Sequence, residues 1–145
     1  RARVVSVLVT DILPPSAEKL ARIAGKTLAL LGQYASLPPV TVAGDDFTIV
    51  RGYIGGGYGV PTDAARRARD LIGELEDILL ETTYSAKCLA AMLDAVRRPE
   101  YHSHPVLFWN TYSSIDPELH LAPLPGYREL PREFHQFFSG PAVPA

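Results

Sequence analysis

The stretch that decides the fold is residues 47–62, which read FTIVRGYIGGGYGVPT. An apolar, β-branched run that starts at Phe47 predicts a buried strand reaching Ile54. The glycines that follow predict a tight loop. Thr62 then suits the N-cap of a helix whose apolar face contains Ala65, Ala68, Leu71, Ile72 and Leu75. Strand, loop and capped helix in this order are typical of an α/β protein.

The same alternation continues on both sides of this stretch. Upstream, a strand precedes a helix that is capped by Ser16 and ends at Gly32. Downstream, a helix that is apolar nearly all round follows Ser85, its predicted cap, and should be mostly buried. The predicted strands are residues 4–9, 47–54, 78–80 and 106–109. This order predicts a parallel sheet with right-handed βαβ crossovers.

The chain is expected to have an α/β portion over residues 1–114 and a tail over residues 115–145. The tail is rich in proline, with Pro117, Pro123, Pro125, Pro131, Pro141 and Pro144. We expect it to be extended and to pack on the body, with a short helix near residues 132–138.

Composition excludes several classes of protein. The 145 residues are 47% hydrophobic with a formal net charge of -2, which argues against a disordered chain and against a nucleic-acid-binding one. No apolar run approaches the roughly 18 residues of a membrane span. The single cysteine, Cys88, predicts a reducing, cytoplasmic location. Because the chain opens at Arg1 directly before a strand, we expect it to be part of a larger unit.

Polar or glycine-rich segments follow each predicted strand. They are Thr10-Asp11 and residues 55–59, 81–85 and 110–114. In a parallel sheet all of these loops emerge at the carboxyl edge, where open α/β sheets bind ligands. The sequence therefore predicts a small-molecule site at this edge.

Each candidate at this edge has a functional and a structural interpretation. The glycines at 55–57 allow backbone close to a ligand or simply make a tight turn before the helix. Tyr84 and Ser85 can stack on a planar ligand and donate to it, or serve as hydrophobic staple and cap, and both roles can hold together. The hydroxyl of Thr111 can meet a ring nitrogen or satisfy its own backbone.

Other motifs are interpreted as structural. Residues 25–27 mimic the end of a phosphate loop but lie within a helix pattern, and the histidine pair at 102 and 104 has no further ligand at recognisable spacing. Cys88 is interpreted as a packing residue rather than a reactive thiolate. No metal site is expected.

Three blocks together resemble a known family: residues 55–62 (GGGYGVPT), 80–87 (LETTYSAK) and 106–111 (VLFWNT). Their order and spacing are similar to the carboxyl-terminal half of pyridoxal-phosphate enzymes of fold type II, the tryptophan-synthase-β-like fold. The branch they most resemble is that of 1-aminocyclopropane-1-carboxylate deaminase and D-cysteine desulfhydrase. The resemblance covers roughly residues 47–111.

The resemblance implies a role for several residues. Tyr84 would stack near the pyridoxal phosphate ring and take part in proton transfer, and Ser85 would lie beside it, close to cofactor or substrate. Thr111 would place its hydroxyl against the pyridine nitrogen. The glycine loop, with Gly56, Gly57 and Tyr58, would line the substrate side.

A neutral hydroxyl at the pyridine nitrogen makes the ring a weaker electron sink than a carboxylate would. This favours β-elimination, β-replacement or ring-opening deamination of a small amino acid. The chain departs from the branch at Ala86, where glycine is usual, at Asn110, where histidine is usual, and at Tyr112-Ser113, where a glycine pair is usual. The bulkier rim that Tyr112 and Ser113 make around Thr111 leaves the identity of the substrate open.

The family's Schiff-base lysine and phosphate loop belong to the amino-terminal half. Lys19, Lys26 and Lys87 do not match the lysine position. We therefore expect this chain alone to be inactive, with the missing half supplied by another chain or segment, and the complete unit to be a homo-oligomer. The alternative is a catalytically inert α/β module with a small-molecule-binding or regulatory role.

Overall fold

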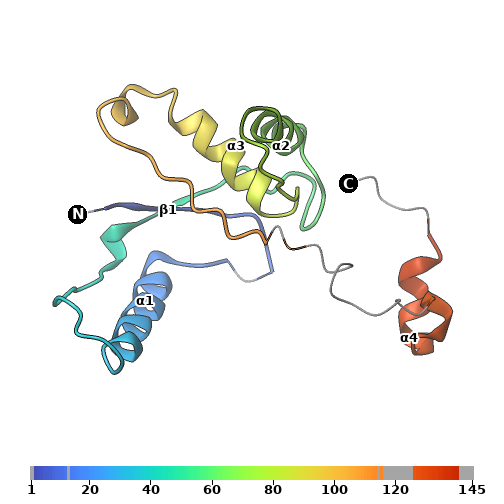
Figure 1. Cartoon of the computed structure of the whole chain (residues 1–145), viewed down its shortest axis with the longest axis horizontal. Coiled ribbons are helices and arrows are strands. Elements are labelled where there is room, and N and C mark those ends of the chain that lie inside the picture. The colour runs from blue at the N-terminus through green and yellow to red at the C-terminus, as the bar shows by residue number, and fades with distance from the viewer. Residues whose placement is uncertain (1, 13, 114, 116–125, 141–145) are drawn as a thin grey trace. The chain divides into compact units, whose positions relative to one another are not determined.

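The computed structural model of the chain describes residues 2–12, 14–113, 115 and 126–140. It divides into two compact units between Thr111 and Tyr112. The first unit contains a strand pair with helices on either side (Figure 1). The second unit contains short helical turns.

The strand pair is formed by β1 (Val4–Val7) and β2 (Phe47–Val50). The two strands are parallel, in a register that aligns Val4 with Phe47 and Val7 with Val50. The pairing continues one residue further, because the N–H of Leu8 donates to the carbonyl oxygen of Val50 at 2.8 Å. Helix α1 (Ala17–Leu31) connects the strands. The predicted parallel βαβ unit is therefore confirmed.

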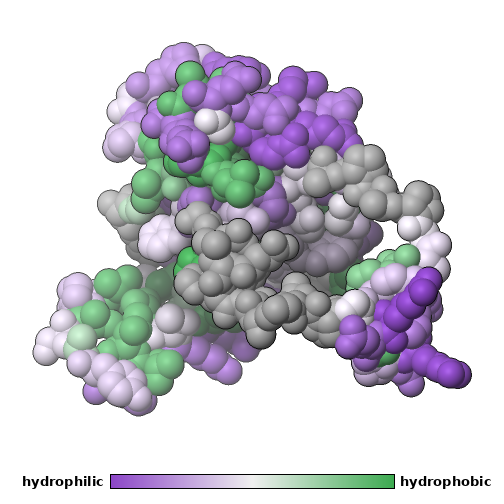
Figure 2. Space-filling model, turned by 45° about the vertical axis from the view of Figure 1, so that its right-hand side comes forward, coloured by the Kyte–Doolittle hydropathy of each residue, from purple (hydrophilic) through white to green (hydrophobic). Residues whose placement is uncertain are grey.

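Helix α1 begins and ends where its sequence predicts. The Ser16 hydroxyl accepts a hydrogen bond from the backbone N–H of Lys19 at 3.2 Å, and Gly32 is the C-cap. None of its residues is fully buried, however, and Ile23, Leu30 and Leu31 are 47%, 53% and 48% exposed. Figure 2 shows apolar side chains gathered at this part of the surface, at the lower left. The predicted apolar face thus exists but is only partly covered.

The core of the first unit lies between α2 (Asp63–Glu76) and α3 (Ser85–Ala95). Small side chains dominate this interface, which lets the two helices approach closely. The buried residues of this core are Ala65, Ala68, Leu80, Ala86, Leu89 and Ala90. Helix α3 also contacts β1, which joins the helix pair to the strands. The prediction that the third helix is mostly buried is confirmed.

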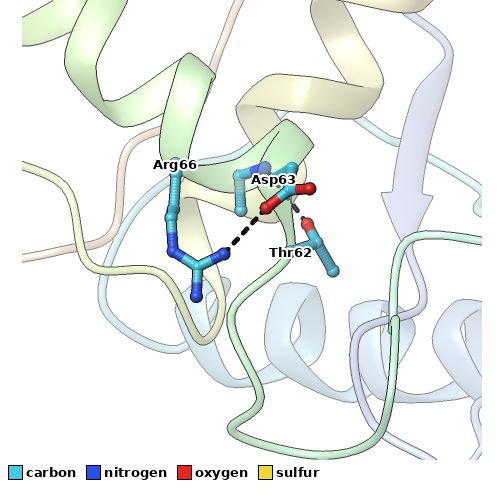
Figure 3. Close-up of polar contacts among 4 residues, drawn as sticks. Thr62, Asp63 and Arg66 are labelled. Atoms are coloured by element: carbon cyan, nitrogen blue, oxygen red, sulfur yellow. Dashed lines mark hydrogen bonds and ion pairs between the residues drawn. The ribbon is translucent and has the colours of Figure 1, made fainter. Parts of the chain in front are cut away.

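Helix α2 starts with the predicted cap. The Thr62 hydroxyl accepts from the backbone N–H of Ala65 at 3.1 Å, and Arg66 pairs with Asp63 at 2.9 Å in the first turn (Figure 3). The helix ends at Asp77, whose φ of 53° is left-handed. A left-handed residue at this point terminates a helix and turns the chain.

Two of the predicted strands do not form in the described part of the chain. Residues 78–80 and 106–109 are irregular. Leu80 is buried in the α2–α3 core, whereas Leu107 and Trp109 are 81% and 79% exposed. An apolar run becomes a strand only when a neighbouring strand satisfies its backbone groups, and here neither segment pairs with β1 or β2.

Short 3₁₀ helices complete the first unit and much of the second. In the first they are η1 (Gly44–Asp46), which leads into β2, and η2 (Pro99–Tyr101), which follows α3. The second unit contains η4 (Tyr127–Glu129), α4 (Arg132–His135) and η5 (Gln136–Phe138). Within the described ranges, no helix is both long and apolar enough to cross a bilayer.

Tyr127 organises the described part of the second unit. Its ring stacks on Phe138 with centroids 5.3 Å apart and meets the His135 ring edge-on at 5.9 Å. The predicted helix near residues 132–138 is present as α4 and η5. The prediction of extended chain through the rest of the tail falls mostly on residues outside the described ranges, and so does that of its packing.

The Thr62 cap gives a test of this architecture. Thr62→Ala removes the acceptor for the Ala65 N–H at the start of a helix that forms half of the core. We expect it to lower the free energy of unfolding by about 1 kcal/mol. Thr62→Ser, which keeps the hydroxyl, should cost less than half as much. Urea unfolding followed by circular dichroism would measure both, and equal losses would contradict the capping role.

Candidate functional site

The start of α3 is held by the side chain of Glu81. Its carboxylate accepts hydrogen bonds from the backbone N–H groups of Thr83 (2.5 Å), Tyr84 (2.9 Å) and Ser85 (2.6 Å), and from the Ser85 hydroxyl (2.8 Å). The first N–H groups of a helix have no partner within the helix, so this carboxylate supplies one. Glu81 was not singled out from the sequence, although an acidic residue just before a helix is a usable signal.

The prediction that Ser85 is the cap of this helix is wrong. Ser85 is the first helical residue, Tyr84 occupies the N-cap position, and the Tyr84 side chain makes no capping bond. The Glu81 carboxylate reaches the same N–H groups from the preceding turn and replaces a serine cap. The predicted hydrophobic staple at Tyr84 requires Ser85 as the cap, so Tyr84, which is itself at the N-cap position, does not occupy the staple position.

Glu81 is ionised at neutral pH. Burial alone would raise the pKa of its carboxyl group, but the hydrogen bonds from Ser85, Tyr84 and Thr83 outweigh burial and lower that pKa below its ordinary value. The helix start therefore carries a fixed negative charge where the helix dipole favours one.

The predicted site residues Tyr58 and Tyr84 meet, although they lie 26 residues apart in the sequence. Their hydroxyl groups are hydrogen-bonded to each other. Their rings pack edge to face with centroids 5.8 Å apart and an interplanar angle of 63°. Tyr58 is 47% exposed and Tyr84 45%, so a small molecule can reach both phenols.

This contact changes the acidity of Tyr84. The hydrogen bond between Tyr84 and Tyr58 is the largest cause of a raised pKa at the Tyr84 phenol, and burial adds to it, as does the negative charge of Glu81. Tyr84 therefore stays protonated well above neutral pH. The site therefore offers a protonated phenol at Tyr84, and its hydrogen bond to the Tyr58 phenol allows a proton to pass between the two.

The loop that carries Tyr58 needs glycine at its first position. Gly55 has a φ of 71°, in the left-handed region. A Cβ at Gly55 would also collide with Cγ2 of Thr62, the residue that caps α2. Gly57 closes the loop, because its carbonyl oxygen accepts from the N–H of Val60 at 3.2 Å. Backbone strain and lack of space thus both explain the glycine that the sequence shows at this position.

Lys87 was expected to belong to the tyrosine motif and not to be the family's Schiff-base lysine. In the structure its side chain is fully buried, with a relative exposure of 0%, in the first turn of α3. Its Nζ donates to the carbonyl oxygen of Ile54, at 2.7 Å. Burial is the main influence on its amine and lowers the pKa, against an opposing effect from the Glu81 charge. Neither the burial of Lys87 nor its bond to Ile54 could have been predicted from the sequence pattern.

Of the remaining predicted site residues, Ser85, Gly56 and Gly57 are sequence neighbours of the two tyrosines, and Thr111 is not. Ser85 is buried beside Tyr84, with its hydroxyl bonded to Glu81. Gly56 and Gly57 lie in the loop next to Tyr58. Thr111 is exposed at the end of the irregular segment that follows residues 106–109. Its role at a pyridine nitrogen stays a prediction, as do the ligand-binding roles of Ser85 and the glycines.

Cys88 fits its structural interpretation. Burial, and then the nearby Glu81 charge, raise the pKa of its thiol. A raised pKa opposes formation of the thiolate, which is the reactive form. In the part of the chain that the structure describes, no cluster of acidic, histidine or cysteine side chains is arranged to hold a metal ion.

The capping role of Glu81 predicts a pH-dependent loss of stability. Glu81→Gln should lower the free energy of unfolding at pH 7 by about 1–2 kcal/mol, because charge-assisted hydrogen bonds become neutral ones. The folded pKa of Glu81 lies below its unfolded value of about 4.3. Its contribution is therefore complete above that value and disappears as the pH falls through the folded pKa.

Urea unfolding at pH 7 and near pH 3 would measure this. The difference between wild type and Glu81→Gln should shrink at the lower pH. Glu74→Gln, at an exposed position of α2, is the matched control and should change stability little at either pH. A Glu81→Gln deficit that is the same at both values would contradict the role of the ionised carboxylate.

Comparison with known proteins identifies relatives. No protein-family model matches the chain. D-cysteine desulfhydrases of Salmonella paratyphi C and Salmonella choleraesuis are each 32% identical over 96 residues, which is 66% of this chain and 28% of each relative. That of Salmonella newport is 31% identical over the same length. The chain thus spans about 28% of the length of the curated relatives it matches. Its resemblance to the branch of pyridoxal-phosphate enzymes that includes D-cysteine desulfhydrase is confirmed.

Proposed function

We propose that this chain supplies one wall of the active site of a pyridoxal-phosphate-dependent lyase that acts on a small amino acid. The observation that carries the proposal is the hydroxyl pair of Tyr58 and Tyr84. These two residues come from two of the blocks that resemble the family. The relatives are named for desulfhydration of D-cysteine, so the favoured reaction is β-elimination from D-cysteine or a similar amino acid.

The side chains at this site fit the cofactor in part. Two half-exposed phenol rings suit contact with a planar ring, and the glycine loop lets backbone approach closely. A free amine is not offered here, because Lys87 is buried and bonded to Ile54, and Lys19 and Lys26 belong to α1. The residues therefore suit the substrate-facing side of pyridoxal phosphate.

Tyr84 is the proposed proton donor. When bound, pyridoxal phosphate supplies an electron sink for the bond changes at the substrate. The sulfur that leaves the substrate would take a proton, and the Tyr84 hydroxyl holds one at neutral pH within reach of a second phenol. Tyr58 can then return a proton to Tyr84 through their shared hydrogen bond.

The other residues have proposed supporting roles. Thr111 would offer a neutral hydroxyl to the pyridine nitrogen, which suits elimination better than transamination. Ser85 would hold Tyr84 in place through Glu81 and lie close to cofactor or substrate. Gly56 and Gly57 would let the substrate approach the loop beside Tyr58. After β-elimination, ring-opening deamination is the second reaction that we propose for this set of residues.

We further propose that the Schiff-base lysine and the phosphate loop come from protein outside this chain. Several observations support a missing layer: the chain spans about 28% of its relatives, α1 exposes its apolar face, and no strand in the described ranges pairs with residues 106–109. That partner segment and this chain would together form one complete unit. We propose that several copies of this unit associate as a homo-oligomer. Without the partner the chain would not catalyse the reaction.

The proton-donor role predicts the effect of Tyr84→Phe. In the assembled enzyme this substitution should lower the rate of sulfide release from D-cysteine about 10²–10⁴-fold, because it removes only the hydroxyl. The absorbance of the bound cofactor should not change. Tyr34→Phe is the matched control, since Tyr34 is 82% exposed, and it should keep full activity. A Tyr84→Phe enzyme with normal turnover would contradict the proposal.

A trapping experiment tests the need for a partner. The chain would be purified with everything that binds it, treated with borohydride and analysed by peptide mass spectrometry. We expect the reduced cofactor on a lysine of a co-purifying segment. A colourless chain with no partner segment would favour the alternative, an inert α/β module that binds a small molecule or regulates.

A further inference from the structure

Lys87 is a buried cation that the proposed reaction does not use. Among the buried polar or charged residues in the described ranges it is the only one with a cationic side chain; the others are Thr82 and Ser85. A lysine ammonium is strongly hydrated, so full burial carries a cost in free energy that some interaction must offset. The interaction present is the hydrogen bond from Nζ to the carbonyl oxygen of Ile54.

Ile54 occupies a particular place in the chain. It is the last residue before Gly55, where the loop that carries Tyr58 begins. Its carbonyl group is held by Lys87 at 2.7 Å, and Lys87 lies three residues after Tyr84 on the same helix. The amine therefore connects the base of the Tyr58 loop directly to the helix that starts at Tyr84.

A second hydrogen bond also joins the segment before the Tyr58 loop to α3. The hydroxyl of Tyr53 donates to Oδ2 of Asp94 at 2.9 Å. Asp94 follows Lys87 by two helical turns and so lies on the same face of α3. Two consecutive residues, Tyr53 and Ile54, are thus tied to one face of one helix. The Tyr53 ring also packs against the α2–α3 core.

The far end of the loop is fixed as well. Thr62 caps α2, and α2 packs against α3. Between these ends the backbone passes through glycines with φ values of 71° at Gly55, 144° at Gly57 and 74° at Gly59. Glycine backbone has many accessible conformations, so the loop interior does not fix the position of Tyr58 by itself. That position depends on where the ends are held.

We propose that Lys87 is a positioning residue that sets Tyr58 against Tyr84 by anchoring the carbonyl group of Ile54. The anchor does not require a charged amine, because a neutral amine also has N–H groups to donate. The importance of the pair for catalysis rests on the proposed function, whereas the pairing itself is a property of this chain. It can therefore be tested without cofactor or substrate.

The test is an NMR titration of the full chain with ¹³Cζ-labelled tyrosine, in which Tyr58→Phe and Tyr84→Phe assign the two signals. In the wild type, Tyr84 should titrate above the ordinary tyrosine value of about 10. Lys87→Met keeps the length and apolar stem of the side chain but removes the donor. We expect it to return the Tyr84 pKa toward 10, as Tyr58→Phe does. Combining Lys87→Met with Tyr58→Phe should then cause no further change.

One control, Tyr53→Phe, and a second substitution of Lys87 separate positioning from general stability. Tyr53→Phe removes the neighbouring bond to Asp94 but leaves the Ile54 anchor and the ring in the core, and it should change the Tyr84 titration less than Lys87→Met does. Lys87→Gln shortens the side chain and removes the amine, and we expect it also to lower the Tyr84 pKa in a folded chain.

The outcomes decide the proposal. A folded Lys87→Met or Lys87→Gln chain with a Tyr84 pKa as high as the wild type would overturn it. Unfolding of both Lys87 variants, under conditions where Tyr58→Phe remains folded, would also overturn it, since Lys87 would then support the whole fold rather than the tyrosine pair. If instead the tyrosine titrations behave as expected but Tyr84→Phe retains full activity, only the proposed catalytic function fails.

Discussion

The close packing of α2 against α3 is the constraint on which the rest of the first unit depends. Alanine occupies the contact positions at Ala65, Ala68, Ala86 and Ala90, so the helices approach without large side chains between them. Close approach brings the N-terminal segments of both helices into one neighbourhood. The loop before α2 carries Tyr58 and the turn before α3 carries Tyr84, so this packing brings the two segments near enough for the phenols to meet.

The site is held by polar groups that are themselves satisfied. Glu81 accepts the first N–H groups of α3, and Lys87 donates to Ile54. In the described residues no buried side-chain nitrogen or oxygen lacks a hydrogen-bond partner. Buried polar groups without partners are costly, so such a network favours one geometry over its alternatives. The residues that flank Tyr58 and Tyr84 are therefore held by satisfied hydrogen bonds.

The exposed apolar residues stand in contrast to this ordered region. Helix α1 and residues 106–109 have apolar side chains that a complete α/β layer would cover. Their exposure is consistent with a chain that spans about 28% of its relatives. The strands predicted at residues 78–80 and 106–109 are irregular because, in the described residues, neither segment pairs with β1 or β2.

The sequence by itself determined the local features. Ser16 and Thr62 cap their helices as predicted, because a cap depends only on residues within one turn, and the motif blocks led to the right branch of enzymes. Only the tertiary structure decided that Glu81 rather than Ser85 caps α3, that Lys87 is buried, and that Tyr58 reaches Tyr84. The bond from Lys87 to Ile54 spans 33 residues of sequence. Burial and long-range contacts of this kind depend on how distant segments pack, which local pattern does not encode.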